Sequence, residues 1–174
     1  MDTLAVVLEG PECLSIRRLD LVPPAEDDVV VAVDWSGVST GTERLLWTGR
    51  MPHFPGMGYP LVPGYEAVGT VVEAGALASA RIGERVFVPG SSNFIDARGL
   101  FGGSARTLIT PQTRAVSLPE GLADQGVLLS LAATAHHAIA GGTRPDLIVG
   151  HGVLGRLLLR LTEALGGERA TVWE

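Results

Sequence analysis

The stretch that decides the fold is DLIVGHGVLGRLLLRL, residues 146–161. Its apolar start predicts a short strand over 146–149, and the leucine-rich remainder predicts a helix over 153–165. The hexad GHGVLG between them fits the pattern GxGxxG. In that pattern the first glycine permits a tight turn, the second lets the backbone approach a pyrophosphate, and the third lets the helix pack close to the strand. We therefore expect a dinucleotide-binding turn built on three glycines, Gly150, Gly152 and Gly155.

A second strand pattern at residues 170–173 follows the helix and gives the β-α-β order of a parallel sheet. Glu174 ends that strand, where an acidic side chain can accept hydrogen bonds from the ribose of an adenosine. A carboxylate there repels a 2′-phosphate, so we expect NAD rather than NADP. The alternative is a glycine-rich turn in a small α/β domain that binds no nucleotide. His151, inside the hexad, either bonds a phosphate or faces solvent.

The residues before the hexad are rich in short strand patterns and in turn residues. The chain has 23 Gly and 11 Pro but only nine aromatic residues, a composition that favours short strands joined by turns over long helices. Such strands are typical of a β-barrel or sandwich. Residues 39–51 are compatible with a helix, and residues 120–141 predict another. The strand patterns fall at residues 4–8, 14–19, 29–33, 67–72, 85–88 and 104–109.

The composition excludes several classes of function. All 13 basic residues are Arg, so Schiff-base chemistry, a pyridoxal phosphate site and a Walker A loop are excluded, because each needs a Lys. One cysteine, Cys13, excludes a disulfide framework and zinc sites with several thiolates. The net charge of -6, without a basic run, gives no footprint for nucleic acid. No apolar run is long enough to span a bilayer, so a cytoplasmic protein is expected.

Four motifs precede the hexad: SGV at 36–38, PLVPGYE at 60–66, GERV at 83–86 and GGSA at 102–105. Together with the hexad they resemble the medium-chain dehydrogenase/reductase superfamily. The resemblance implies a mixed fold with a GroES-like β-barrel catalytic domain over residues 1–120. A connecting helix and the first β-α-β unit of a truncated, NAD-binding Rossmann α/β domain would follow over residues 121–174.

A longer block is more specific within that superfamily: STGTERLLWTGRMP, residues 39–52, and FPGMGYP, residues 54–60. The block is similar to the dehydrogenases that act on bacteriochlorophyllides, the tetrapyrroles of bacteriochlorophyll biosynthesis. This resemblance implies a tetrapyrrole substrate whose hydroxyethyl side chain is oxidised to acetyl, with NAD as the hydride acceptor.

Zinc-dependent members of the superfamily carry metal ligands at three positions that are changed here. They place a cysteine, a histidine and a further cysteine or acid where this chain has Ser39, Tyr65 and, by approximate alignment, Ser130. Neutral hydroxyls are poor zinc ligands beside thiolate and imidazole. The resemblance therefore implies a zinc-free member with no metal at its site.

Without zinc, another group must take the hydroxyl proton and stabilise the developing alkoxide. We expect Tyr65 to handle the proton and Ser39 to bond the substrate oxygen. The alternative is that both side chains only fill the space of a lost metal. Glu66 is either a proton relay or a structural acid that bonds the backbone of the barrel.

The proline-rich loop holds the candidate substrate-binding residues. His53 either ligates the magnesium of a macrocycle or is an ordinary exposed residue. Phe54 and Tyr59 either offer a flat apolar surface to a tetrapyrrole or pack the loop onto the barrel. In the specific block Thr42 is a candidate helix cap. The sequence does not divide nucleotide contacts from structural roles between its neighbours Thr40 and Glu43.

Two other functions fit the residues: a zinc-free quinone or enone reductase, which usually prefers NADP, and a non-catalytic module that binds a tetrapyrrole or nucleotide. A dinucleotide domain needs about five or six parallel strands, and this sequence reaches the second. We therefore expect an incomplete domain and no turnover by the 174-residue chain alone. Apolar side chains on the helix would then be exposed, namely Leu157, Leu158 and Leu161, which favours either a homodimer or poor order after Gly142.

Overall fold

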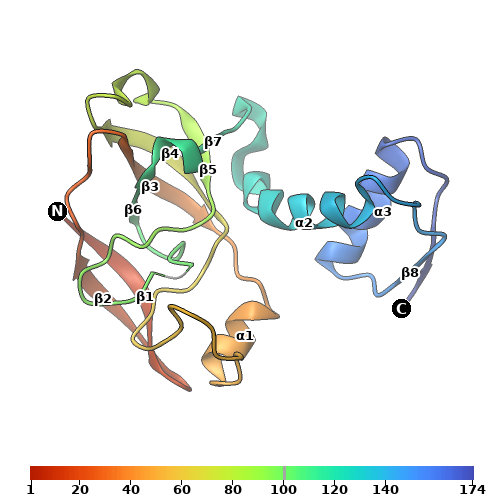
Figure 1. Cartoon of the computed structure of the whole chain (residues 1–174), viewed down its shortest axis with the longest axis horizontal. Helices are drawn as coiled ribbons and strands as arrows, with labels where there is room; N and C mark the ends of the chain where they lie inside the picture. The colour runs from red at the N-terminus through yellow and green to blue at the C-terminus, as the bar shows by residue number, and fades with distance from the viewer. Residues whose placement is uncertain (100) are drawn as a thin grey trace. The chain divides into compact units, whose positions relative to one another are not determined.

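The chain begins with a long antiparallel hairpin in the computed structural model, which describes residues 1–99 and 101–174 (Figure 1). β1 (Asp2–Gly10) pairs with β2 (Cys13–Asp20), and the turn between them places Glu12 at a φ of 58°. The two strands predicted here are confirmed, and each is longer than the apolar pattern that indicated it.

A five-stranded antiparallel sheet follows, in the order β6-β3-β4-β5-β7. The hairpin joins it through residues 104–106: the Val6 N–H donates to the Ser104 carbonyl, and the Arg106 N–H donates to the Leu4 carbonyl. These bonds bring hairpin and sheet together as the predicted β-barrel. The strands are β3 (Asp28–Ser36), β4 (Ala67–Ala74), β5 (Arg85–Val88), β6 (Thr107–Pro111) and β7 (Val116–Ser117).

The main core gathers side chains from the hairpin and the sheet. β3 lies between β4 and β6 in the sheet, and its residues 28–31 are buried on both faces, not on the one face that strand alternation would suggest. Central strands are covered on both sides, so their sequences read as continuous apolar runs. The largest fully buried core side chains are Val7, Leu19, Val29, Val30, Val31, Val62, Val71, Leu108 and Ile109.

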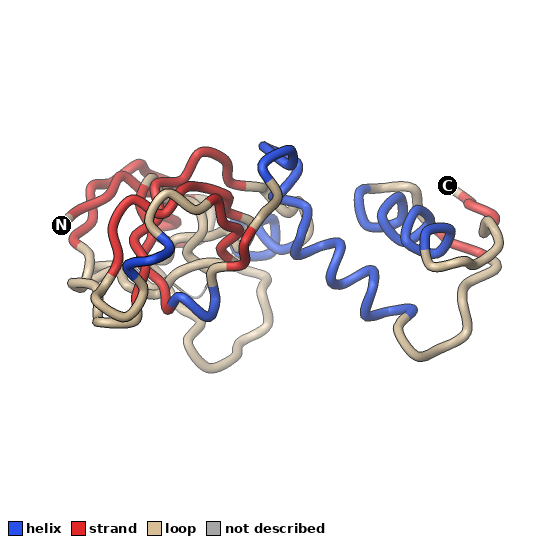
Figure 2. The backbone as a smooth tube through the Cα atoms, turned by 90° about the horizontal axis from the view of Figure 1, so that it is seen from above, coloured by secondary structure: helices blue, strands red, loops and turns tan. Residues whose placement is uncertain are grey.

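The helical segments that come before residue 120 are short (Figure 2). α1 (Thr42–Trp47) is six residues long, although residues 39–51 are helix-compatible. Two 3-10 turns, η1 (Ser79–Arg81) and η2 (Gln112–Arg114), flank the sheet strands. α1 positions the specific block because its buried Leu46 packs with Leu8 and Leu61 in a second apolar cluster.

The helix expected over residues 120–141 is two helices of different kinds. η3 (Glu120–Leu128) is a 3-10 helix, and α2 (Leu129–Ile139) is an α-helix. Gly121 and Gly126 lie in the first part, and each glycine costs an α-helix about 1 kcal/mol relative to alanine. Among the described residues, no helix has the length and apolar character needed to cross a membrane.

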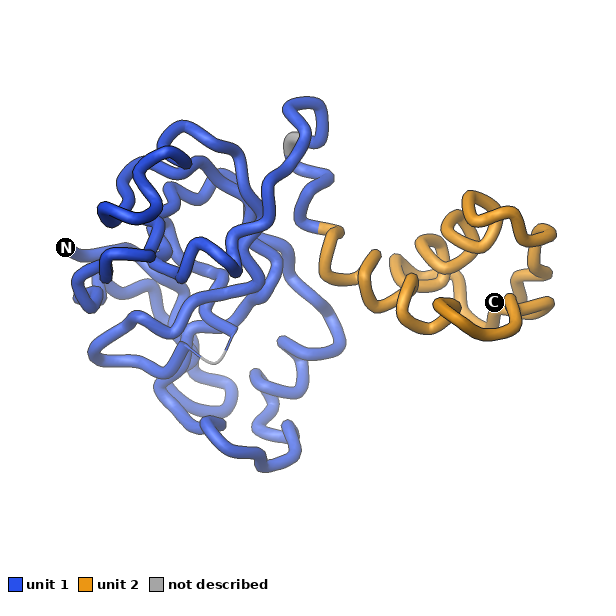
Figure 3. The backbone as a smooth tube through the Cα atoms, turned by 45° about the horizontal axis from the view of Figure 1, so that its top comes forward, with its two compact units in different colours: residues 1–127 blue, residues 128–174 orange. Residues whose placement is uncertain are grey.

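The chain divides into two compact units, residues 1–127 and 128–174 (Figure 3). The second unit holds β8 (Leu147–Val149), α3 (Val153–Ala164) and β9 (Thr171–Trp173), and β8 pairs parallel with β9. The β-α-β order predicted from the sequence is therefore confirmed. A small core forms between strands and helix from three buried residues, Ile148, Leu159 and Ala170.

The exposed apolar surface of this unit differs from the prediction. Leu157, Leu158 and Leu161 are half-buried, because this side of α3 faces the strands and α2 within the unit. The exposed apolar side chains lie on β8, β9 and the start of α3 instead. They are Leu147, Val149, Val153, Leu154 and Trp173, and Leu165 is a further one directly after α3.

Candidate functional site

Two of the family motifs form one backbone-bonded structure at the candidate site. The Gly103 N–H donates to the Gly64 carbonyl at 2.7 Å, and the Ser104 N–H donates to the Pro63 carbonyl at 2.9 Å. The segments that precede Tyr65 and β6, about 40 residues apart in sequence, are thereby held side by side. This pairing fixes the direction in which the chain enters Tyr65.

Tyr65 is half-buried and lies against α1. Its hydroxyl is 3.4 Å from Thr42 Oγ1, and its ring packs against Phe101 with 5.5 Å between ring centroids. Thr42 is the first residue of α1, whose N-cap is Gly41 with no side-chain cap bond, so the prediction that Thr42 caps the helix is wrong. The Thr42 hydroxyl lies beside the Tyr65 hydroxyl instead of capping a backbone N–H group of α1.

Ser39 lies in the turn that leads into α1. Its side chain is half-buried, and its carbonyl accepts a hydrogen bond from the Glu43 N–H at 3.0 Å. Since Tyr65 contacts the first residue of the same helix, the structure brings the segments of both candidate proton-handling residues to one end of α1.

Glu66 is buried, with 4% of its surface exposed, and its Oε1 has no hydrogen-bond partner among the described residues. Its backbone carbonyl accepts from the Gly37 N–H at 2.7 Å, and a Cβ on Gly37 would lie 2.2 Å from Glu66 Oε2. The carboxyl thus occupies the space that the missing side chain of Gly37 leaves. Burial, and then the nearby charge of Glu43, raise the pKa of Glu66. Among the described residues, Glu66 Oε1 bonds neither the barrel backbone nor a side chain, so the choice between a proton relay and a structural acid stays open.

Glu43 is the site residue whose role the sequence left open between a nucleotide contact and a structural one. Both of its carboxylate oxygens are inaccessible to solvent, and neither has a hydrogen-bond partner in residues 1–99 and 101–174. Burial raises the pKa of Glu43. The nearby backbone N–H groups of Glu43 itself, Ser39 and Gly64 lower this pKa in part, although none of them forms a hydrogen bond with the carboxylate. A signal was present, because Glu43 is three residues before the buried Leu46 and so shares its helix face.

The three candidate substrate-binding residues have different surroundings. His53 is exposed and Phe54 is half-buried in the proline-rich loop. The Tyr59 hydroxyl donates to the Leu46 carbonyl, and its ring packs on the cluster of Leu8, Leu46 and Leu61. Tyr59 therefore ties the loop to α1.

A pocket of about 410 Å³ opens beside α1 within the first unit. Glu43 and Arg44 contribute its charged side chains, and the rest of its lining is mainly apolar. His53, Phe54 and Tyr59 do not line it. The apolar lining comes from β1, β2, α1 and the loops between, and it includes Val6, Leu8, Leu14, Val38, Trp47 and Pro63.

The glycine hexad has the geometry that a dinucleotide phosphate requires. Gly150 has a φ of 98°, and its N–H donates to the Trp173 carbonyl at 2.8 Å, so the turn is anchored to the end of β9. A Cβ on Gly155 would lie 2.1 Å from the Gly150 carbonyl oxygen, which only a glycine permits. Gly152 caps α3 with extended backbone, no side-chain bond and open space around it, and the first turn carries no acid. The residues present therefore fit a pyrophosphate at the start of α3.

The other two residues assigned to this turn have separate positions. His151 is half-buried, and its carbonyl accepts from Arg156 Nε at 3.1 Å. Glu174 is exposed directly after β9.

The three positions that hold zinc ligands in zinc-dependent relatives carry hydroxyls, at Ser39, Tyr65 and Ser130. Ser130 lies in α2, in the second unit. In the part of the chain that the structure describes, no three His, Cys, Asp or Glu side chains gather to hold a metal ion. The donor set of this chain does not fit a catalytic zinc.

Comparisons with known proteins agree with this arrangement. The family model of the alcohol dehydrogenase GroES-like domain matches residues 25–120. The whole chain is 58% identical to a 2-desacetyl-2-hydroxyethyl bacteriochlorophyllide A dehydrogenase of Cereibacter sphaeroides and 51% identical to one of Rhodobacter capsulatus. It spans 57% and 56% of the length of these relatives.

Among solved structures, a short chain alcohol dehydrogenase from E. coli CFT073, complexed with NADH, superimposes with a TM-score of 0.78. It is 25% identical in sequence, and the match covers 98% of this chain and 56% of that one. The predicted fold class, a GroES-like β-barrel followed by the start of a Rossmann domain, is confirmed. The chain belongs to the alcohol dehydrogenase GroES-like domain family, within the medium-chain dehydrogenase/reductase superfamily.

Proposed function

We propose that the protein oxidises the hydroxyethyl side chain of a bacteriochlorophyllide to acetyl, with NAD as the hydride acceptor. The observation that carries this proposal is the 58% identity, over the whole chain, to the Cereibacter sphaeroides protein of that name. The identity includes the barrel that would form the substrate side of the site, since the match covers all 174 residues.

The cofactor would be held by the hexad at the start of α3. Gly150 and Gly155 shape the turn, and the space beside Gly152 lets the pyrophosphate reach the free N–H groups of the helix. The bound nicotinamide supplies the hydride acceptor. Glu174, exposed at the end of β9, would accept bonds from the ribose and repel a 2′-phosphate, which favours NAD over NADP.

The hydroxyls at the end of α1 would manage the alcohol. Tyr65 takes the proton and Ser39 bonds the reacting oxygen, roles that a hydroxyl performs without a metal. The contact between Tyr65 and Thr42 supports these roles, because it holds the phenol at the helix end that Ser39 precedes. His53, Phe54 and Tyr59 would contact the macrocycle. Of these, His53 is the exposed side chain and the one able to reach a bound magnesium.

The test compares the 174-residue chain with a fusion that adds the part of the Cereibacter sphaeroides relative lying outside the match. Each protein is mixed with a hydroxyethyl bacteriochlorophyllide and NAD or NADP, and NADH or NADPH formation is followed by absorbance. We expect the fusion to reduce NAD and the 174-residue chain alone to reduce neither. If the fusion leaves the bacteriochlorophyllide (the chlorin) unchanged but oxidises NADPH when a quinone is supplied, it would be a reductase. One that binds the chlorin without forming NADH would be a binding module.

A further inference from the structure

Two acids with solvent-inaccessible carboxylate oxygens, the half-buried Glu43 and the buried Glu66, lie at the end of α1. Glu43 comes from the first turn of the helix, and Glu66 comes from the loop before β4. The surface of Glu66 is 4% exposed. Within the part of the chain that the structure describes, Glu66 Oε1 and both carboxylate oxygens of Glu43 have no hydrogen-bond partner, and all three atoms are inaccessible to solvent. The backbone brings the two acids into one region, because Gly37 N–H donates to the Glu66 carbonyl at 2.7 Å and Glu43 N–H donates to the carbonyl of Ser39, two residues further along, at 3.0 Å. The charge of Glu43 also contributes to the raised pKa of Glu66.

The two acids have different environments. Glu43 lies near the backbone N–H groups of Ser39 and Gly64 and of its own residue, which favour a negative charge. Glu66 packs against the bare Cα of Gly37, and its Oε1 faces no donor. Charging both acids would place two like charges in a site with little water, which is strongly unfavourable. One negative charge is therefore best placed on Glu43, and one proton on Glu66.

The other ionisable groups around the pair are few. Arg44, next to Glu43 on α1, lines the same pocket, but among the described residues it forms no ion pair with either acid. The phenols of Tyr65 and Tyr59 also pack on α1, through Thr42 and the Leu46 carbonyl respectively. The described contacts thus leave the acids without a cation that would let both ionise.

We propose that Glu43 and Glu66 hold one proton between them, and that this pair receives the hydroxyl proton released at the site. The second part rests on the proposed function. Oxidation of the alcohol breaks its C–H and O–H bonds and forms a C=O bond. The hydride reduces NAD to NADH. The proton passes by way of the Tyr65 hydroxyl to the Glu43 carboxylate, which becomes a carboxylic acid.

The pair is tested without substrate by carbon-13 NMR titration of carboxyl-labelled glutamates in the 174-residue chain, compared with the same chain unfolded in urea. In the folded protein, the Glu66 carboxyl should remain protonated at a pH where the unfolded glutamates have ionised. Glu43→Gln should lower the titration midpoint of the Glu66 carboxyl by about one pH unit, because the neighbouring negative charge is removed. Glu73→Gln, which removes an exposed carboxylate of β4, should leave it unchanged.

Ionisation of both acids together with the unfolded glutamates, measured on the unsubstituted chain, would overturn the shared proton whether or not the variants fold. A Glu66 midpoint that ignores Glu43→Gln would overturn the pairing. The role in the reaction is tested in the fusion protein from the pH dependence of kcat/KM. Glu43→Gln should remove its acid limb, and an intact limb overturns that role. Turnover failing in every variant and in the unsubstituted fusion would reject the proposed function while the titration still decides the pair.

Discussion

Ser39 and Tyr65, near the end of α1, have hydroxyl groups at positions where zinc-dependent relatives carry zinc ligands. The contacts of each hydroxyl limit the chemistry that it can perform. Tyr65 combines a ring packed on Phe101 with a hydroxyl held at Thr42. The ring contributes to stability and the hydroxyl to the proposed chemistry. A phenylalanine at this position keeps the ring and loses the hydroxyl, so it tests the two contributions separately.

Tyr65→Phe should therefore leave the barrel folded and stop the reaction. The lost contact with Thr42 is long, so we expect a loss of about 1 kcal/mol or less in the free energy of unfolding. NADH formation by the fusion protein should fall by about 10²–10⁴, the usual contribution of a positioned proton-transfer group. Urea unfolding and steady-state kinetics measure the two effects, and unchanged turnover would exclude Tyr65 as the proton-handling group.

Two glycines of the hexad offer a matched pair of substitutions. Gly155→Ala would press a methyl group onto the Gly150 carbonyl, so the second unit should lose about 1–3 kcal/mol of stability together with nucleotide binding. Gly152→Ala meets no neighbour and keeps an ordinary φ of -70°, so it should fold normally. Its methyl group should still weaken NAD binding, because it occupies the space that the pyrophosphate needs. Circular dichroism melting and NAD titration distinguish the two, and equal melting of both variants would contradict this account.

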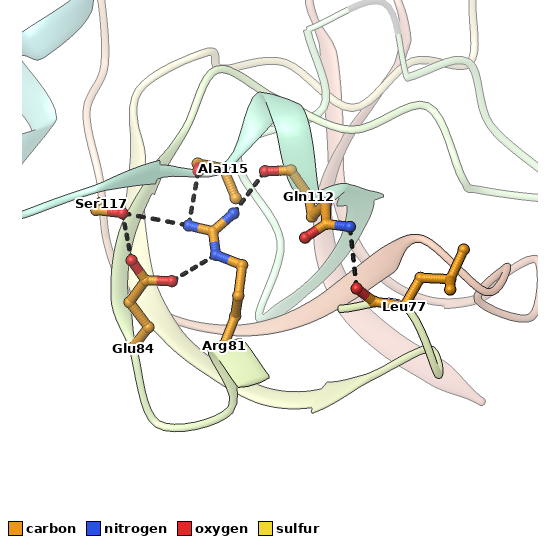
Figure 4. Close-up of polar contacts among 6 residues, drawn as sticks. All are labelled: Leu77, Arg81, Glu84, Gln112, Ala115 and Ser117. Atoms are coloured by element: carbon orange, nitrogen blue, oxygen red, sulfur yellow. Dashed lines mark hydrogen bonds and ion pairs between the residues drawn. The ribbon is translucent and has the colours of Figure 1, made fainter. Parts of the chain in front are cut away.

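At the scale of elements, one arginine ties η1 to the segment before β7 (Figure 4). Arg81 Nε bonds Glu84, while its two terminal nitrogens donate to the carbonyls of Gln112 and Ala115. Ser117 also donates to Glu84. The side chains of Arg81 and Glu84 are 19% and 29% exposed, so this cluster is partly shielded from water.

Arg81→Ala should cost about 1–3 kcal/mol, because Glu84 and the carbonyls of Gln112 and Ala115 each lose a charged donor, although Ser117 still donates to Glu84. Arg18→Ala removes another ion pair, with Asp2, whose side chains are 66% and 45% exposed, and should cost about 0–1 kcal/mol. Urea midpoints of both variants measure the difference. A similar small cost for both would mean that the Arg81 bonds do not stabilise the barrel.

The sequence predicts elements best where one local signal is strong. The span 85–88 and the strands around the hexad match the structure closely, because apolar runs there are bounded by glycine or proline. Residues 104–106 precede β6 because they bond the distant strand β1, which no local pattern contains. The same holds for the site. Motifs in the sequence identify Ser39, Tyr65 and the hexad, whereas the pairing of Glu43 with Glu66 depends on the folded structure, which shields the carboxylate oxygens of Glu43 from solvent.

At the scale of the whole molecule, carboxyl groups whose pKa values shift in opposite directions on folding make the stability of the protein depend on pH in opposite ways. The hydrogen bond from Arg81, then that from Ser117, lower the pKa of Glu84, so its stabilising effect is present above the unfolded pKa and is lost as pH falls through the folded one. Burial raises the pKa of Glu66, so the folded state binds the extra proton and loses stability as pH rises from the unfolded pKa to the folded one.

Glu66→Gln should accordingly stabilise the protein at about pH 8 relative to the unsubstituted chain, and the gain should shrink towards about pH 4. Glu84→Gln should destabilise it at about pH 8, and that loss should shrink at low pH. Urea unfolding across this range measures both. A gain for Glu66→Gln that grows as pH falls would contradict the raised pKa.

The two compact units have separate cores, and these differ greatly in size. The first unit has a large core built from its hairpin and sheet, whereas the second relies on Ile148, Leu159 and Ala170. Small cores give marginal stability, so β8 and β9 should exchange their amide hydrogens before β3 and β4. Ile148→Ala should cost the second unit about 2–5 kcal/mol and speed exchange only within residues 128–174. Val68→Ala is the matched change in the first unit. Hydrogen exchange followed by mass spectrometry tests the difference, and simultaneous loss of protection in both units after Ile148→Ala would show that they unfold as one.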